Sequence, residues 1–356
     1  MDGAGFWDLD VSTPKTLDGL ASPVPGDSIL LGLSKGTRLS RPNQMDFMQC
    51  FMHAPLILSY AKPQGLCLQR VLTIPFSDRW LCHLKYLRKL SLRGYENLKN
   101  MTNGISNLKN LHYLDLSWTS NEKLPNSMCL LINLQTLKLI HCRCLTKLPS
   151  NFCKLINLRH FELVGSNIEK MPNYIGKLKH LRTMNKFVVA EKGGSKLKEL
   201  GILDHLTGSR SISNVGCIDE TTEVREAKLK EKHLDTLMLQ YWRCHEVALH
   251  QESIVEALEP NHAIEELTVD GYIGGKFPNW VGGSHLANLV SLYLLRCAKF
   301  EQLPLFGQLP SLQKLVIKGF DGIKVIGEEF YGNGSSSAPF CCLSYLSSDE
   351  MLDGEE

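Results

Sequence analysis

Apolar residues recur in this chain as short triplets, in which the second residue follows the first by three positions and the third follows by two more. The first clear triplet is Leu87, Leu90 and Leu92. Its alternating second half predicts a short strand with one buried face, because successive side chains of a strand point to opposite faces. The triplets that follow are Leu111-Leu114-Leu116, Leu134-Leu137-Leu139, Leu158-Phe161-Leu163, and Leu181 with Met184.

The triplets return at a nearly constant period. Their first residues, from Leu87 to Leu181, lie 24, 23, 24 and 23 positions apart. This period is typical of leucine-rich repeats, in which each unit buries its leucines only against its neighbours. The sequence therefore predicts an α/β solenoid, a leucine-rich-repeat horseshoe with a concave parallel β-sheet and an irregular convex side of short helical or 3-10 segments. A proline returns in each connecting arm, at Leu124-Pro125, Leu148-Pro149 and Met171-Pro172.

The second half repeats less regularly. Leu234, Ile264, Leu289 and Leu312 begin triplets at spacings of 30, 25 and 23 residues. Between Met184 and Leu234 the period is lost, and the spacing at 196–206 and 220–232 favours helical segments. At the front, residues 69–74 are expected to form an irregular first strand, and Leu343 and Leu346 are expected to begin one more unit. The predicted organisation is a loosely ordered non-repeat segment at 1–65, a first repeat block at 66–190, a helix-bearing junction at 191–233, a second block at 234–346 and an acidic tail at 347–356.

Composition indicates a folded protein without a strongly charged partner. The chain is 43% apolar and 21% charged, with a net charge of +2, which favours neither nucleic acid nor an anionic membrane. The twelve cysteines include no Cys-x-x-Cys pair, so we expect a reducing, cytoplasmic environment and no zinc site. Cys142 and Cys297 follow the triplets directly and are predicted to be structural. No stretch is apolar enough to span a membrane.

The strand positions between the buried residues are predicted to face outward and to bind a protein. In the first block their net charge is basic, and in the middle of the second block they are acidic, which suggests a charge-graded groove. Thr268 and Val316 are expected to point outward as well. The predicted binding residues are Arg88, Lys89, His112, Tyr113, Asp115, Lys138, Arg159, His160, Glu162, Asp235, Glu265, Glu266, Tyr293 and Lys314.

No motif for catalysis or cofactor binding appears. The closest approach to a phosphate-binding loop runs from Gly271 to Phe277, but its spacing is short, and Phe277 stands where a hydroxyl would hold magnesium. The metalloprotease, hydrolase and dinucleotide fingerprints do not occur. We therefore expect no enzyme activity, no cofactor and no metal site.

Several segments resemble one family. The units Asn110-Leu-His-Tyr-Leu-Asp-Leu-Ser117 and Asn133-Leu-Gln-Thr-Leu-Lys-Leu-Ile-His-Cys142 resemble cytosolic plant-type repeats. The junction, with Met184-Asn-Lys-Phe-Val-Val189, is similar to that in coiled-coil-type plant NB-ARC leucine-rich-repeat disease-resistance proteins. Further matches are Leu197-Lys-Glu-Leu-Gly201, Lys276-Phe-Pro-Asn-Trp280, the segment from Leu303 to Leu312, and Val325-Ile-Gly-Glu-Glu-Phe-Tyr331.

The resemblance implies a recognition and regulatory module of plant defence. In that family the repeats sense a pathogen effector or a guarded host protein, and at rest they hold the nucleotide-binding domain inactive. No nucleotide-binding motif precedes the repeats here, so we expect a truncated homologue that lacks that domain. The alternative is an intracellular leucine-rich-repeat scaffold of the small-GTPase-binding type, although the irregular junction speaks against such a uniform array.

Overall fold

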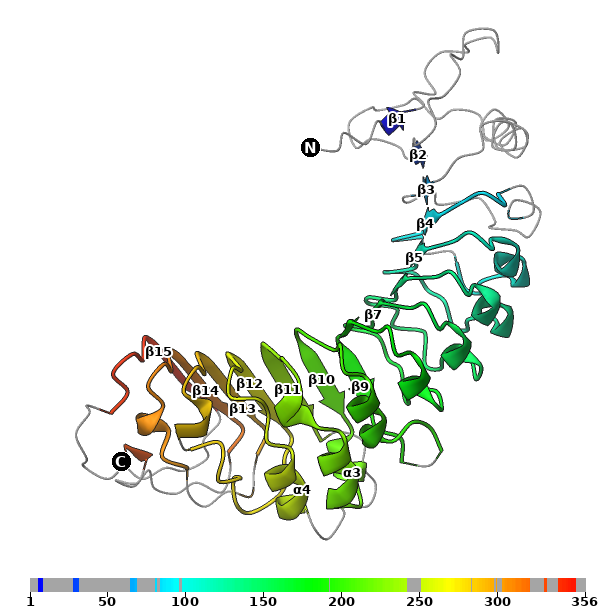
Figure 1. The fold of residues 1–356 in the computed structure, drawn as a ribbon. Helices are drawn as coiled ribbons and strands as arrows, with labels where there is room; N and C mark the ends of the chain where they lie inside the picture. Colours follow the sequence, from blue (N-terminus) through cyan, green and yellow to red (C-terminus); the bar gives the residue numbers. More distant parts are fainter. Residues whose placement is uncertain are drawn as a thin grey trace, which may run out of the picture. The chain divides into compact units, whose positions relative to one another are not determined.

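A computed structural model describes residues 81, 84–95, 98–191, 193–241, 251–282, 284–297, 299, 303–320, 330–331 and 339–349, together with three short strands before them. The chain divides into two compact units, Met1–Ile168 and Glu169–Glu356. In each unit short parallel strands follow one another along the chain, and short 3-10 or α-helices join most of the described strands (Figure 1). The predicted solenoid of parallel strands with short 3-10 and helical segments is thereby confirmed.

In the first unit the strands pair in chain order, each with the next. Leu90 pairs with Leu114, and Leu137 pairs with Phe161, so the apolar triplets lie in register. Successive coils therefore stack leucine on leucine, which buries what one repeat alone cannot. The elements are β1 (Phe6–Asp8), β2 (Ser28–Leu31), β3 (Gly65–Leu68), β4 (Lys89–Ser91), η2 (Asn103–Asn107), β5 (Tyr113–Asp115), η3 (Asn126–Leu130), β6 (Thr136–Lys138), η4 (Phe152–Lys154) and β7 (His160–Glu162).

The second unit continues the same pattern with longer strands and two α-helices. Its strands from β9 onward also pair in parallel, each with its neighbour. The elements are η5 (Ile175–Lys177), β8 (Thr183–Met184), β9 (Lys186–Val188), η6 (Leu197–Ile202), β10 (Arg210–Ser213), η7 (Val215–Cys217), α3 (Thr221–Glu226), η8 (Leu229–Glu231), β11 (Thr236–Gln240), α4 (Gln251–Ala257), β12 (Glu266–Asp270), η9 (Ser284–Leu286), β13 (Ser291–Leu295), η10 (Phe306–Gln308), β14 (Lys314–Lys318) and β15 (Tyr345–Asp349).

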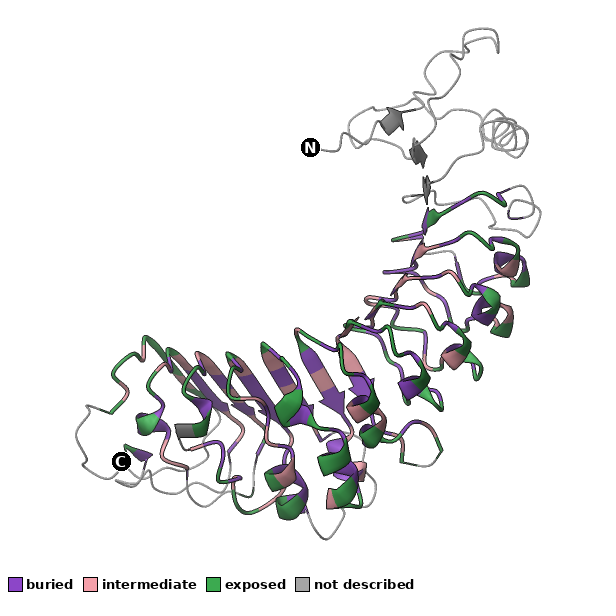
Figure 2. Cartoon of the chain, viewed as in Figure 1, coloured by how far each residue is buried: buried purple, intermediate pink, exposed green. Residues whose placement is uncertain are grey.

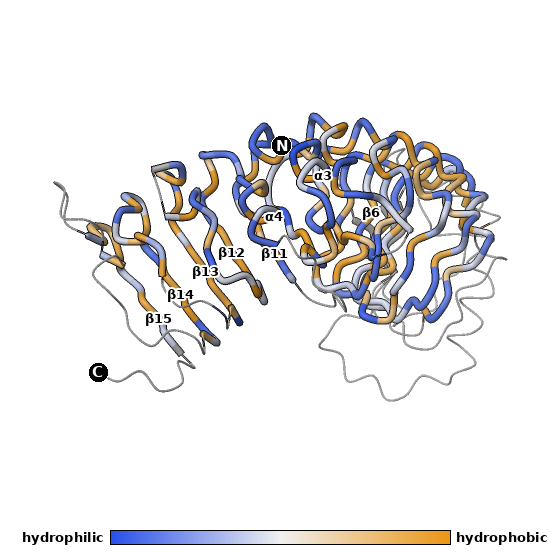
Figure 3. Tube along the Cα trace, turned by 90° about the horizontal axis from the view of Figure 1, so that it is seen from below, coloured by the Kyte–Doolittle hydropathy of each residue, from blue (hydrophilic) through white to orange (hydrophobic). Residues whose placement is uncertain are grey.

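The core follows the triplets closely. All three leucines of the first triplet have no exposed surface, and the same holds for the three triplets after it. Figure 2 shows buried residues along the strands β9–β14, with exposed residues on the helices α3 and α4. Figure 3 shows the corresponding alternation of hydropathy along β11–β14. We call the outward side of the parallel strands in each unit the strand face.

Side chains at fixed places in the repeat satisfy the backbone between coils. Asn110, Asn133 and Asn157 each donate from Nδ2 to a carbonyl of the preceding coil, at 3.0, 2.9 and 2.8 Å. Thr119 Oγ1 donates to Leu116 O at 2.7 Å. The asparagine bonds are exposed, whereas the Thr119 bond is buried, where a carbonyl without a partner would be costly.

The junction contains a strand that the leucine spacing did not predict. Arg210–Ser213 pairs with β9 on one side and β11 on the other, so the parallel ladder runs through this segment. The helical spacing expected at 196–206 appears as the 3-10 helix η6, and that at 220–232 appears as α3 followed by η8.

The ends of the predicted domains are only partly described. The expected strand at 69–74 lies outside the described residues, whereas β3 is placed just before it. Most of segment 1–65 also lies outside them, apart from β1 and β2. The extra unit expected after Leu343 supplies β15, which pairs with β14. The predicted domain boundaries stay a prediction.

Candidate protein-binding surface

Parallel pairing in the first unit lines up the outward residues of β4 to β7 in two rows. Lys89, Tyr113, Thr136 and His160 form one row, and Ser91, Asp115, Lys138 and Glu162 form the other. The register brings residues about 24 positions apart in sequence into adjacent places. The strand face can therefore present a continuous surface to a partner, as the alternation of strand side chains requires.

Most of the residues predicted to bind a partner are accessible. Arg88, Lys89, Arg159, Asp235 and Glu265 are exposed. The half-buried ones are His112, Tyr113, Lys138, His160, Glu162, Glu266, Tyr293 and Lys314.

Asp115 is the exception, and its predicted exposure is wrong. Its side chain is buried at 4% exposure, and Oδ1 accepts a hydrogen bond from the backbone N–H of Ser117 at 2.9 Å. The carboxylate thus holds the turn after β5, as Asp side chains do when they bond the backbone two residues on. Tyr113 Oη donates to the other carboxylate oxygen at 3.4 Å. Burial, with the Asp115 charge second, raises the pKa of Tyr113 to about 12.

The charges of the first unit's strand face are partly paired. Lys138 Nζ and Glu162 Oε1 lie 3.2 Å apart, both partly exposed, so their ion pair contributes little stability. Arg88 lies at the N-terminal end of the strands, where its carbonyl accepts hydrogen bonds from the N–H groups of His112 and Tyr113 at 2.8 and 3.0 Å. Arg159 occupies the corresponding place three coils later. These exposed guanidinium groups can orient an acidic partner.

The strand face of the second unit differs in two places from the prediction. Thr268 and Val316, expected to point into solvent, are buried at 5% and 6% exposure. Lys314 Nζ lies over the rings of both Tyr293 and Tyr345, at 5.2 and 5.1 Å from their centroids. This cation–π arrangement fixes the lysine between two rings.

In the strand register of the second unit, Glu266 is not directly beside a basic residue. Glu266 pairs with Thr236 and Ser291 along one row, and that row continues to Lys314. Asp270, which was not predicted, is buried, and its carboxylate lies 2.6 Å from Arg296 Nη2. The sequence offers little signal for it, because it lies at the end of the strand, after the apolar triplet.

The two cysteines predicted to be structural are both fully buried. Cys142 Sγ donates to Leu116 O at 3.1 Å, and Cys297 Sγ donates to Leu295 O at 3.3 Å. Burial raises the pKa of both thiols, that of Cys297 to about 12. Both therefore stay protonated near neutral pH, a form that neither attacks electrophiles nor binds metal. Among the described residues, no group of three His, Cys, Asp or Glu side chains could hold a metal ion.

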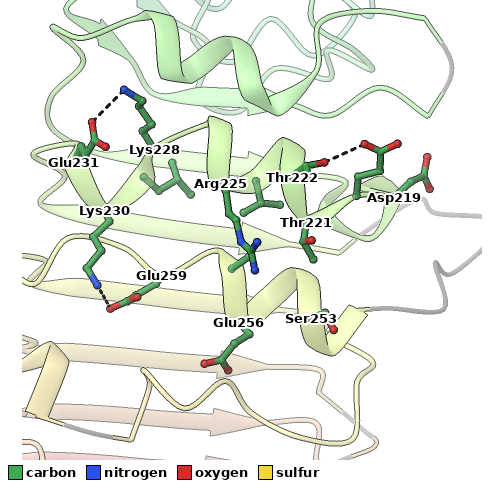
Figure 4. A pocket seen from close by; sticks show the side chains of 14 residues that line it. Asp219, Thr221, Thr222, Arg225, Lys228, Lys230, Glu231, Ser253, Glu256 and Glu259 are labelled. Carbon is green, nitrogen blue, oxygen red and sulfur yellow. Dashed lines mark hydrogen bonds and ion pairs between the residues drawn. The ribbon is translucent and has the colours of Figure 1, made fainter.

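A groove on the helical side of the second unit was not predicted. It has a volume of about 940 Å³ and lies between the segment from Asp219 to Glu231 and the helix α4 (Figure 4). One ion pair joins Lys228 to Glu231 at 3.5 Å within the first segment, and another joins Lys230 to Glu259 at 2.8 Å. Glu256 accepts the backbone N–H of Asn279 at 2.9 Å. Most of its charges thus already have partners within the fold.

Comparison with known proteins supports the resemblance seen in the sequence. Residues 197–320 match the family model described as R13L1/DRL21 LRRs. A candidate disease resistance protein of Arabidopsis thaliana is 38% identical over 275 residues, which is 74% of this chain and 19% of that protein. A candidate RPP13-like disease resistance protein from the same plant is 32% identical over 329 residues, 88% of this chain and 30% of its own length.

This chain carries leucine-rich repeats homologous to those of plant disease resistance proteins. The resemblance inferred from the junction is thus confirmed. The chain spans less than a third of the length of either relative. Among solved structures, the plant peptide hormone receptor RGFR1, in complex with RGF2, has a TM-score of 0.52 at 19% identity, covering 84% of this chain and 46% of that one. That likeness confirms the leucine-rich-repeat fold.

One shorter match is of another kind. The chloroplastic protein TRIGALACTOSYLDIACYLGLYCEROL 4 of Arabidopsis thaliana is 54% identical over 88 residues, which is 22% of this chain and 18% of that protein. Its share is far smaller than the 74% that the first resistance protein matches, so it concerns one segment of the chain. In the part of the chain that the structure describes, no helix is long and apolar enough to cross a membrane.

Proposed function

We propose that the chain is a recognition and regulatory module of plant defence that binds a protein through its strand face. The partner would be a nucleotide-binding domain of a resistance protein, a pathogen effector or a guarded host protein. The homology to disease resistance proteins carries this proposal. It is supported by the exposed basic side chains Arg88, Lys89 and Arg159 on the first unit.

The role is one of binding rather than catalysis. Leucine-rich repeats are typically interaction modules. Among the described residues, the interior hydrogen bonds hold the coils of the solenoid together. Docking on a nucleotide-binding domain would be autoinhibitory, and binding of an effector or host protein would be the sensing event. We place this function in the cytoplasm. The match of residues 197–320 to resistance-type repeats favours this function over a small-GTPase scaffold.

Co-purification with the nucleotide-binding domain of a full-length relative tests the proposal. We expect the unaltered chain to retain that domain, and the triple change Arg88→Glu/Lys89→Glu/Arg159→Glu to abolish retention. The matched control is Lys109→Glu/Lys147→Glu/Lys154→Glu, which makes the same change of charge at exposed positions away from the strands. If both variants lose retention equally, the loss is due to the change in net charge and not to the strand face. No retention by the unaltered chain would contradict docking.

A further inference from the structure

A small apolar surface lies just beyond the ends of strands β5, β6 and β7. Trp118 is 45% exposed and Val164 is 48% exposed, while Ile140 is half-buried. Ile140 and Val164 each follow the last residue of their strand by two positions, so they share the outward side with Lys138 and Glu162. The backbone N–H of Trp118 donates to Ile140 O at 2.8 Å, which joins the coils at this point.

The Trp118 side chain packs on a ring of the next coil. Trp118 and His141 have φ values of +61° and +54°, while the equivalent residues of the flanking coils are Gly94 and Gly165. The His141 ring lies directly over Gly165 and leaves no room for a side chain there. The Trp118 ring rests on that of His141 at a centroid distance of 4.1 Å. Positive φ is regular at this place of the repeat, since Gly271, Arg296 and Gly319 have it as well, and bulky residues rarely adopt it.

The part of the first unit that carries this surface is strongly basic. Residues 81–168 contain twelve Lys and Arg but four Asp and Glu, a net charge of +8, although the whole chain has +2. Two of those four acids are already used, because Asp115 is buried in its turn and Glu162 is paired with Lys138. An acidic partner would thus be attracted to this unit and oriented by it.

We propose that Trp118, Ile140 and Val164 form an anchor site for an apolar side chain carried by an acidic, extended protein segment. An exposed aromatic ring beside aliphatic side chains, with charged residues around them, has the composition of an interface hot spot. Ile140 and Val164 offer no side-chain hydrogen bond to a base or a phosphate, which favours a protein segment over nucleic acid. This inference rests on the proposed function and locates one contact within it.

Peptide binding to the full chain tests the anchor site. The probe is a fluorescein-labelled peptide of Glu and Ser residues with one central Phe. Two peptides serve for comparison: the same peptide with a central Ala, and the Phe peptide with Lys in place of Glu. We expect binding of the Phe peptide to be at least about tenfold tighter than that of the Ala peptide, as hot-spot contacts give. The Lys peptide is expected not to bind. Failure of the Phe peptide to bind overturns the proposal.

Variants assign the binding to the site. Trp118→Gly, which installs the residue of the flanking coils, and Ile140→Ser/Val164→Ser are each expected to weaken the Phe peptide by about tenfold. The control Ile132→Ser/Ile156→Ser removes an exposed apolar pair that precedes the strands of the same unit, and it is expected to change the affinity less than twofold. Circular dichroism verifies that each variant is folded. The proposal is overturned if Trp118→Gly binds the Phe peptide as tightly as the unaltered chain does. It is also overturned if a single-stranded oligonucleotide binds as tightly as the Phe peptide and its binding depends on Trp118.

The two proposals fail separately. If Trp118→Gly still retains the nucleotide-binding domain while the strand-face charge reversal does not, the anchor site is wrong for that partner and the proposed function stands. If the Phe peptide binds through Trp118 but no nucleotide-binding domain is retained, the anchor site stands and docking on that domain is wrong.

Discussion

The ring centroids of Trp118 and His141 lie 4.1 Å apart, and both residues have the left-handed backbone conformation that L-amino acids avoid. The left-handed conformation costs roughly 1–2 kcal/mol for a residue with a side chain. The contact between the two rings returns about 0.5–1.5 kcal/mol. For Trp118 alone the two contributions are of similar size, so its side chain gives the fold little net stability.

We therefore expect Trp118→Gly to change the free energy of unfolding by less than about 1 kcal/mol, although it removes the largest kind of side chain. Urea denaturation followed by circular dichroism measures this. The comparison is Trp280→Ala, which removes a tryptophan buried at 3% exposure whose Nε1 donates to Val255 O at 3.1 Å. That change should cost about 3–5 kcal/mol. A loss of that size for Trp118→Gly would mean that the ring is part of the core.

Arg210 occupies a place in the stack where the next strand, β11, has a leucine. It pairs in register with Leu237 and is 3% exposed. Its Nη1 donates to Met184 O, while Nη2 has no hydrogen-bond partner among the described residues. Burial lowers the pKa of Arg210 to about 10, so the group is still charged at neutral pH and its desolvation opposes folding there.

Arg210→Leu is expected to stabilise the chain by about 1–4 kcal/mol, because it replaces a buried unpaired charge with the residue that fits the stack. The lowered folded-state pKa means that the cost is fully present below about pH 10 and shrinks above it. The gain should thus be the same at pH 6 and pH 8 in urea denaturation. A destabilised variant would show that the hydrogen bond to Met184 outweighs the desolvation.

Asp115 is expected to be a structural residue rather than a contact residue. Asp115→Ala removes the acceptor for the Ser117 N–H and should cost about 1–3 kcal/mol, the penalty of an unsatisfied buried donor. Asp115→Asn keeps an acceptor oxygen and should cost less. Thermal unfolding measures both. Unchanged stability of Asp115→Ala, together with loss of partner binding, would restore Asp115 to the binding surface.

Cysteine reactivity should separate buried from exposed thiols. Cys142 and Cys297 are fully buried, whereas Cys144 and Cys341 are exposed. Because the thiolate is the reactive form and burial raises the pKa of Cys142 and Cys297, both should resist iodoacetamide in the native chain at pH 8. Mass spectrometry of the peptides follows the modification. Labelling of Cys142 as fast as Cys144 would contradict the packing of this coil.

The fold was predictable where every core position is apolar. The triplets from Leu87 to Leu163 predicted their strands, since a constant period forces the same residues of successive coils into register. The strand β10 was missed because Arg210 stands at the core position that would otherwise mark it. A buried arginine has no signal in a search for apolar spacing, and only the pairing with Leu237 shows it.

The binding surface was predictable only in part. Alternation placed Lys89 and Lys138 outward correctly, but it could not show that Asp115 bends back to its own turn. Trp118 was missed because it lies after the triplet, in a turn where the backbone conformation decides the direction of the side chain. Comparison with Gly94 and Gly165 at the same place in the flanking units was the available signal.

The most direct test of the account is hydrogen–deuterium exchange of the full chain with and without the nucleotide-binding domain of a full-length relative. Binding at the strand face predicts slower exchange on addition of the domain in peptides covering residues 86–94, 110–118, 133–141 and 157–165. Peptides over the 3-10 helices η2 to η4 should exchange as before. Protection confined to those helices, or no protection anywhere, would contradict the claim that this chain recognises its partner through the strand face.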